Sequence, residues 1–467
     1  MDIIINLKFF SFTRSISINR RWLQIGIVIA VLLASVMISF WGSTNIFLVF
    51  LVLFGGIAFL FGILRQPNIG FLFLIAGGML IPMRGPSGLS IATVMVALML
   101  GLWIMDMFIV KRNVQFIRSF AMLPVVVFLV ISVLAFIVGQ IPWFVFARQA
   151  PLDAQVGGFS IFIFSIGGLL LSAHLIKDVR WLKIIVWTFI GLSTIYVIAR
   201  AANLSVVANL FHLGYTAQSM FWTWLVTLAF SQVLFNSMLK RQVRWFLIGL
   251  VLLVLFVGIF QMYTWKSGWV PPAIAAAVLI GLRYRKLIIF AIPFVVVATL
   301  YLVMDLIGAE DYSWGTRVDA WRIVLEIGRV SPLLGMGFAN YYWYTPLFPI
   351  RGWRVSFNSH SQFVDLIAET GYIGMLAFLW VFFEIGRLCW RLAKHFPEGF
   401  ERAYIYGVLA GVIASIVASL LGDWVLPFVY NVGLAGFRSG ILPWIFMGGV
   451  IALEQIHLRS SQYQESG

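Results

Sequence analysis

The sequence has few charged residues. Only 10% of its 467 residues are Asp, Glu, Lys or Arg, whereas 62% are hydrophobic. A soluble globular protein carries about 25% charged residues, so this composition excludes an ordinary soluble domain. Apolar runs recur at the roughly 20-residue length with which a helix crosses the hydrocarbon core of a membrane. Together with the mean hydropathy of +1.01, these runs predict an integral membrane protein.

Other features are scarce or missing. The single cysteine, Cys389, excludes an internal disulfide and a thiolate metal cluster. Strand-like alternation of apolar and polar residues is not evident, so we expect an all-α fold. The alternation of strands and helices that builds a soluble nucleotide-binding domain is missing as well. An enzyme with this sequence is therefore expected to take its substrate from the membrane or from the outer space.

The apolar runs predict about 14 transmembrane helices in a single integral membrane domain, residues 1–467. Basic residues concentrate in alternate loops. With a cytoplasmic N-terminus, about two thirds of the 32 Lys and Arg residues lie inside. This asymmetry predicts that both termini are cytoplasmic, and it explains most of the net charge of +15 without a nucleic-acid partner. The basic N-terminal segment resembles a signal peptide, but the long apolar run after it predicts an uncleaved first helix. The predicted helices are 22–41, 45–64, 69–83, 91–110, 120–139, 156–175, 181–200, 214–236, 245–264, 267–282, 287–306, 372–393, 404–421 and 438–455.

The predicted outer face carries a group of cations. Its longest segment, 307–371, is expected to be a large extracytoplasmic loop. Arginine binds phosphate oxygens in a two-pronged fashion, and lysine acts as a point charge. Lipid headgroup contacts and local pairs such as Arg322 with Glu326 are the alternative for any single cation, but the group as a whole favours anion binding. These cations are Arg200, Lys266, Arg317, Arg322, Arg329, Arg351 and Arg354.

Two of the five histidines, His212 and His360, fall on this face. A lone histidine is usually structural, and we keep that interpretation for His212. A helix that begins after His360 places Asp365 and Glu369 on one face, as supporting carboxylates behind the histidine. Surrounding cations lower the pKa of a histidine and keep it neutral. His360 is therefore our candidate general base.

The sequence offers little for other kinds of catalysis. The serines of "GPSGLS" at 85–90 have no adjacent His or Lys, which argues against a serine hydrolase. A metal site needs two or three clustered His, Asp or Glu residues. Asp305, Glu310 and Asp311 come close, but solvation of a loop is the simpler role for them. We expect neither a metal nor another cofactor.

The predicted outer loop is rich in aromatic residues, among them Tyr341, Trp343 and Trp353. Their ring faces suit the binding of sugars. Trp and Tyr also anchor membrane proteins at the lipid–water interface, so the pattern leaves both roles open. We take these three residues as candidate sugar-binding groups.

Two stretches, "RVDAWRIVLEIGRVSPLLGMGFANY" and "HSQFVDLIAETGYIGML", resemble the signature region of the O-antigen ligase and O-antigen polymerase superfamily. The family pattern is a histidine, a small polar residue, nine residues and then Gly-x-x-Gly. Here it begins at His360 and Ser361 and ends at Gly371 and Gly374, two glycines that also permit a bend. The preceding run matches as Arg317, Trp321, Pro332, Leu333, Leu334, Gly335, Gly337 and Asn340.

The resemblance implies a GT-C-like glycosyltransferase that works on the outer leaflet with glycans carried on undecaprenyl diphosphate. It implies that His360 deprotonates the acceptor hydroxyl, and that outer-face arginines, here Arg200 and Arg317, hold the diphosphate. We add Lys266 and Arg354 to this diphosphate group. Where the family often shows Ser-Arg, this chain has Lys266 followed by serine, so this cation cannot clamp phosphate with two prongs.

The expected function is a metal-independent, inverting polymerase of surface polysaccharide (O-antigen or exopolysaccharide) in the bacterial inner membrane. The alternative is an O-antigen ligase that joins the glycan to a lipid or protein acceptor, because both activities share the signature motif. The polymerase is favoured slightly, since nothing in the sequence points to a lipopolysaccharide-core acceptor. A polysaccharide transporter or flippase is a more distant alternative, because the charges lie at span ends rather than at mid-membrane depth. The expected partners are the lipid-linked donor, a glycan or lipid acceptor and membrane lipids, and binding of a chain-length regulator stays open.

Overall fold

The computed structural model describes residues 55–56, 59–81, 88–113, 116–211, 218–284, 286 and 312–465. The predicted helices 22–41 and 287–306, most of 45–64, and His212 lie outside these residues. The chain divides into two compact units, Met1–Arg65 and Gln66–Gly467. The fold described below is that of the second unit.

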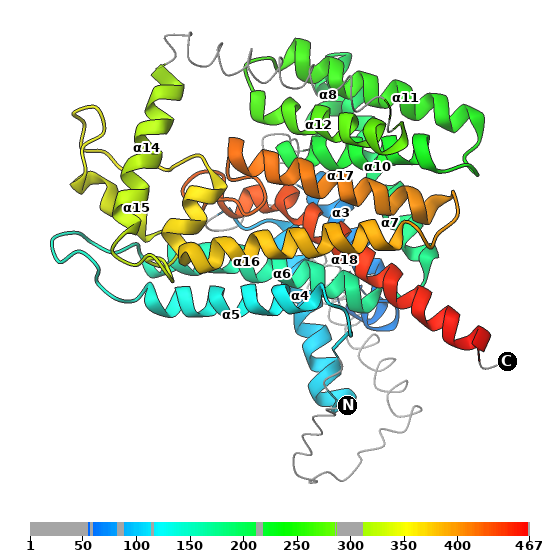
Figure 1. The fold of residues 1–467 in the computed structure, drawn as a ribbon, viewed down its shortest axis with the longest axis horizontal. Coiled ribbons are helices and arrows are strands. Elements are labelled where there is room, and N and C mark those ends of the chain that lie inside the picture. The colour runs from blue at the N-terminus through cyan, green and yellow to red at the C-terminus, as the bar shows by residue number, and fades with distance from the viewer. Residues whose placement is uncertain are drawn as a thin grey trace, which may run out of the picture. The chain divides into compact units, whose positions relative to one another are not determined.

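The described residues of this unit form helices, and one isolated bridge joins Ile350 and Trp353. Figure 1 shows several of the longer helices lying side by side across the picture. The helices are α3 (Asn68–Leu80), α4 (Ile91–Met105) with its extension η2 (Asp106–Val110), α5 (Met122–Val138), α6 (Leu152–Leu175), α7 (Val179–Ala201), α8 (Ser205–Asn209), α10 (Ser219–Phe235), α11 (Arg241–Phe256) with η3 (Val257–Gln261), α12 (Lys266–Arg283), α14 (Tyr312–Gly328), α15 (Asn340–Tyr344), η5 (Thr345–Leu347), α16 (Gln362–Leu392), α17 (Phe400–Leu421) and α18 (Gly433–Glu465).

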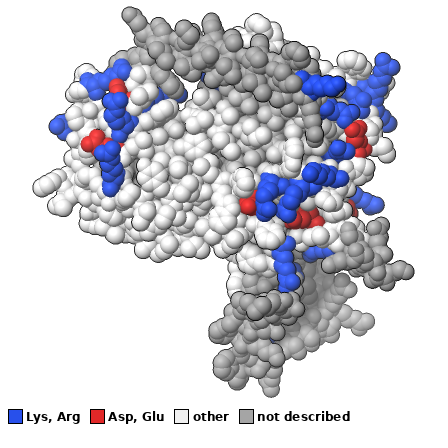
Figure 2. All heavy atoms as spheres, viewed as in Figure 1, with Lys and Arg blue, Asp and Glu red and all other residues white. Residues whose placement is uncertain are grey.

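Seven helices in the described part of the chain are long and apolar enough to cross a membrane, and three shorter apolar helices accompany them. Figure 2 shows Lys and Arg at two ends of this unit, with a broad belt of uncharged residues between them on the face in view. The prediction of an all-α polytopic membrane protein is therefore confirmed. The predicted spans from 69–83 to 267–282 and from 372–393 to 438–455 each overlap a helix.

One end of the bundle carries α14 and α15, and we call it the His360 end (Figure 1). Here α14 buries Val324 and Ile327 against Val364 and Ala368 of α16. The opposite end carries the turn between α16 and α17. The part of α16 that follows its break at Gly371, residues 372–392, spans roughly 30 Å at 1.5 Å per residue, and it separates the two ends.

Candidate active site

The α16 helix is interrupted at Gly371, whose φ of 71° and ψ of −178° are not helical. Only glycine adopts this conformation readily, because a side chain would clash with the backbone. A Cβ atom there would lie 2.1 Å from the carbonyl oxygen of Leu333. The bend expected at this glycine is confirmed. It separates a short helix, which begins just after His360, from the remainder of α16.

The break leaves backbone amides and carbonyls of α16 without helical partners, and the segment 332–337 forms hydrogen bonds with them. The amides of Met336 and Gly337 donate to the carbonyls of Ala368 and Glu369, at 2.8 and 3.0 Å. In return, the amide of Tyr372 donates to the carbonyl of Pro332 at 2.8 Å. A buried backbone group without a partner is costly, so this exchange stabilises both segments. We call it the clasp. The signature run "PLLGMG" and the "ETGYIG" run are thus two halves of one structural unit.

A buried carboxylate fixes the turn that carries His360. Asp365 Oδ1 accepts hydrogen bonds from the hydroxyls of Tyr341, at 2.5 Å, and Ser359, at 2.6 Å. The amide of Ser361 donates back to Ser359 Oγ at 3.0 Å. Asp365 is only 1% exposed, and a buried polar group left without hydrogen bonds is costly. Asp365 therefore supports the histidine indirectly, because it binds Ser359, the residue that precedes His360.

Glu369 lies one helical turn further along the same face of α16. It is also buried, and its Oε1 accepts a hydrogen bond from the amide of Ala339 at 2.8 Å. Ala339 has a φ of 66° at the start of α15. This carboxylate therefore anchors the beginning of α15 next to the clasp.

His360 itself has a φ of 52°, a left-handed conformation that is uncommon for residues other than glycine. Its side chain is half-buried. Burial lowers the pKa of His360, the guanidinium of Arg317 lowers it further, and the carboxylate of Asp423 acts in the opposite direction. The imidazole is therefore biased toward the neutral form, which can accept a proton.

Asp423 is a site residue that the sequence reasoning missed. It is 1% exposed, and its carboxylate accepts from the amide of Phe428 and from the side chain of Asn431, both at 2.7 Å. Burial raises the pKa of Asp423, and these hydrogen bonds and His360 lower it. The signal available was an acidic residue at the end of an apolar span, where a charge is costly unless it is used.

The loop after α17 is tied to the histidine segment at other points. The amide of Leu426 donates to Gln362 Oε1 at 2.8 Å. The ring of Phe428 stacks on that of Tyr341, with centroids 4.9 Å apart. These contacts bring Asp423 to His360 although 63 residues separate them in the sequence.

Arg317 is positioned by α14. One turn beyond it, Trp321 donates from its indole nitrogen to the carbonyl of Ser359 at 2.7 Å, and residues four apart share a helix face. Arg351 pairs with Asp319 on the same helix, with 2.9 Å between Nε and Oδ2. The first contact holds α14 against the turn that carries His360, and the second ties α14 to the segment around Arg351.

Lys266 begins α12. The ring of Trp265, its neighbour, packs edge-on against Trp424, with centroids 5.8 Å apart, beside Asp423. Arg200 is exposed in the last turn of α7. That end of α7 is linked to η3 by a hydrogen bond from Gln261 to the carbonyl of Ala201 at 3.2 Å. The last turn of α7 and the first turn of α12 thus lie at the His360 end of the bundle.

Arg354 has a different environment. It is exposed, and its Nη1 donates to the carbonyls of Pro346 and Leu347 at 3.4 and 3.3 Å. These contacts hold the guanidinium against η5. In the described part of the chain, Arg354 forms no hydrogen bond or ion pair with Arg317 or His360.

The three aromatic candidates separate by exposure. Tyr341 is fully buried, and burial together with the Asp365 carboxylate raises its pKa well above the usual value, so its hydroxyl serves as a hydrogen-bond donor. Trp343 is half-buried and donates to the hydroxyl of Tyr430 at 2.6 Å. Trp353 is 67% exposed. The two tryptophans are thus the candidates with ring surface left for a sugar.

Among the described residues, no group of three or more His, Cys, Asp and Glu side chains could hold a metal ion. The candidate site brings together His360, whose pKa is lowered, and the charged groups of Asp423 and Arg317 that act on it. Such a set can remove a proton from a hydroxyl and stabilise an anionic leaving group.

The fold and this site define a polytopic all-helical membrane protein with a histidine-centred site at one end of its bundle. Residues 204–379 match the family model described as O-antigen ligase. The match contains the signature runs quoted above, so over these residues the chain is similar to the O-antigen ligase family. No curated protein matches the chain.

Proposed function

We propose that the chain is a membrane glycosyltransferase that transfers a glycan from undecaprenyl diphosphate to a sugar hydroxyl and so polymerises a surface polysaccharide. One observation carries the proposal. Half-buried His360 lies within the family-matched segment and has a lowered pKa, which Arg317 lowers and Asp423 raises. A neutral base next to a cation is what this transfer needs, because a proton leaves one reactant while negative charge develops on the other.

In the proposed reaction, the imidazole of His360 takes the proton of the acceptor hydroxyl as its oxygen attacks the anomeric carbon. The bond between that carbon and the diphosphate oxygen breaks, and the diphosphate leaves with the bonding electrons. Arg317 stabilises its charge, with Lys266 and Arg200 as further contacts. A single displacement of this kind inverts the anomeric configuration. Asp423 stabilises the imidazolium that forms.

The proposal places the site on the outer face of the bacterial inner membrane, with both termini in the cytoplasm. The basic segments 177–183 and 240–244 contribute Lys183 and Lys240 to the end of the bundle opposite His360. Basic loops are typical of the cytoplasmic side, which supports an outer location for His360.

An O-antigen ligase is the second candidate, and the description of the matched family favours it. The test uses purified protein in lipid vesicles with a repeat unit linked to undecaprenyl diphosphate, and the products are separated by size. A ladder of products supports the polymerase. Transfer only to a separately added acceptor makes the chain a ligase, and no transfer to either contradicts the proposal.

The acid limb of the pH–rate profile should report the two charges next to His360. Since the neutral imidazole is the active form, activity falls as the pH drops through its pKa. Asp423 raises that pKa and Arg317 lowers it, so Asp423→Asn should shift the acid limb to lower pH and Arg317→Gln to higher pH. The measurement is kcat/KM against pH for each variant. Shifts in the same direction for both variants would contradict this electrostatic arrangement.

A further inference from the structure

A cleft of about 870 Å³ lies at the end of the bundle opposite His360. Three elements form its walls: α7, the turn between α10 and α11, and the start of α17. Among the side chains that line it are Lys183, Trp187, Met238, Lys240, Phe400 and Glu401. No residue of the candidate active site is among the lining residues, so the cleft is a separate feature.

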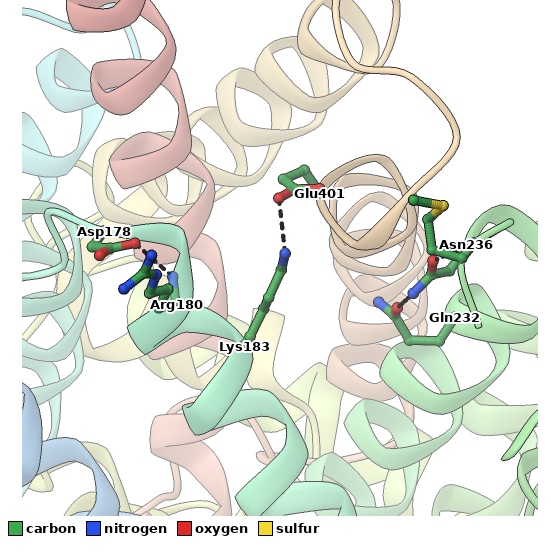
Figure 3. A network of polar contacts seen from close by, with 7 residues as sticks. Asp178, Arg180, Lys183, Gln232, Asn236 and Glu401 are labelled. Carbon is green, nitrogen blue, oxygen red and sulfur yellow. Dashed lines mark hydrogen bonds and ion pairs between the residues drawn. The ribbon is translucent and has the colours of Figure 1, made fainter. Parts of the chain in front are cut away.

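Both acidic residues of the cleft already have a cationic partner. Glu401 pairs with Lys183 at 3.3 Å (Figure 3), and Glu398 pairs with Arg283. Lys240 is exposed and forms no ion pair within the described part of the chain. The cleft thus retains a surplus positive charge, which favours an anionic ligand.

The turn between α10 and α11 is held firmly enough to present this charge. Asn236 donates to Gln232 Oε1 at 2.8 Å (Figure 3). The guanidinium of Arg244 donates to the carbonyl of Asn236 at 2.9 Å, and Ser237 donates to the carbonyl of Glu398 at 2.6 Å. Lys240 follows directly on this turn, so its position relative to the α17 wall is defined.

The other walls of the cleft are apolar. Trp187, Leu239, Val243 and Phe400 line it, and Met238 is 85% exposed. An exposed methionine beside a tryptophan at the end of a membrane helix suits contact with an acyl chain, because Trp and flexible apolar side chains are typical of the lipid interface. The ligand should therefore be both anionic and apolar.

We propose that this cleft binds an anionic phospholipid from the leaflet opposite the active site. Its phosphate lies at Lys240 and Lys183, and an acyl chain follows Trp187 and Met238. Basic pockets between the ends of membrane helices bind such headgroups. A zwitterionic lipid has no net charge to match the surplus, so it binds more weakly.

The test is native mass spectrometry of the purified full chain with dioleoyl phosphatidylglycerol and, separately, dioleoyl phosphatidylcholine. The wild type should retain the anionic phosphatidylglycerol in preference to the zwitterionic phosphatidylcholine. One basic residue at a membrane surface changes lipid affinity by about fivefold, so Lys240→Gln should weaken retention about fivefold. Glu401→Gln removes the partner of Lys183 and should strengthen it. Lys394→Gln, at the same end but outside the cleft, is the matched control and should bind like the wild type.

Three results would overturn the proposal. Equal retention of the two lipids by the wild type excludes an anionic preference, and unchanged binding by Lys240→Gln excludes the assigned site. Displacement of the lipid by millimolar inorganic phosphate makes the ligand a small anion instead. Lys240→Arg keeps the charge and should bind normally, and the thermal midpoint of each variant in neutral lipid shows that a loss of binding is not a loss of folding. The opposite signs for Lys240→Gln and Glu401→Gln cannot arise from misfolding alone.

Discussion

Replacing His360 by Asn is expected to lower the rate of glycan transfer by at least about 10²-fold, the usual contribution of a general base. Asparagine is the appropriate substitute because it tolerates left-handed backbone conformations better than most residues, and His360 has a φ of 52°. The turn should therefore persist while the proton acceptor is removed. The measurement is the initial rate of transfer in lipid vesicles at saturating lipid-linked donor.

The matched control is His395→Asn, the same change at an exposed histidine in the turn after α16, at the opposite end of the bundle. It should keep the wild-type rate, and both variants should have the wild-type thermal midpoint. A His360→Asn variant that retains a rate within about threefold of the wild type means that another group takes the proton, since general-base catalysis contributes far more than that. Catalysis would then depend on the cations alone.

Replacing Gly371 by Ala is expected to destabilise the His360 end and to abolish transfer. Alanine in this backbone region costs about 1–3 kcal/mol. The added Cβ would also lie 2.1 Å from the Leu333 carbonyl oxygen, so the clasp has to open. Opening leaves the amides of Met336 and Gly337 unpaired, each at a further cost of about 1–3 kcal/mol if they stay buried. The measurements are the thermal midpoint and the transfer rate.

The control for this substitution is Gly191→Ala in α7, because a Cβ there meets no atom within 4 Å. Alanine is the better helix former, so this variant should be at least as stable as the wild type. If Gly371→Ala has the same midpoint and rate as Gly191→Ala, the clasp does not hold the site together.

The all-α polytopic class could be predicted because the length of apolar runs reports directly on membrane-crossing helices. The short helix after His360 was also predictable, since Asp365 and Glu369 follow it at helical spacing. The hydrogen bonds of Asp365 to Ser359 and Tyr341 were not predictable. They depend on how the α15 region folds back over α16, and no local pattern encodes that contact.

Asp423 and Tyr341 show two different reasons why the sequence alone could not predict the whole site. Asp423 lies beyond α17, and only tertiary packing brings it to His360, so the signature runs give no hint of it. Tyr341 was grouped with other aromatic residues as a candidate sugar contact, but composition cannot tell a buried ring from an exposed one. Its ring stacks on Phe428, a contact made by the same loop that carries Asp423. The residues that assemble the site across the sequence were thus the ones that local reasoning could not place.

The clasp also bears on how the protein is made. Its first half, residues 332–337, is synthesised before α16, so its backbone partners do not yet exist when it leaves the ribosome. Asp423 follows later still, after α17 has been inserted. A chain arrested before that helix would carry His360 without its carboxylate neighbour. The nascent protein therefore cannot assemble its complete site until nearly all of it has entered the membrane.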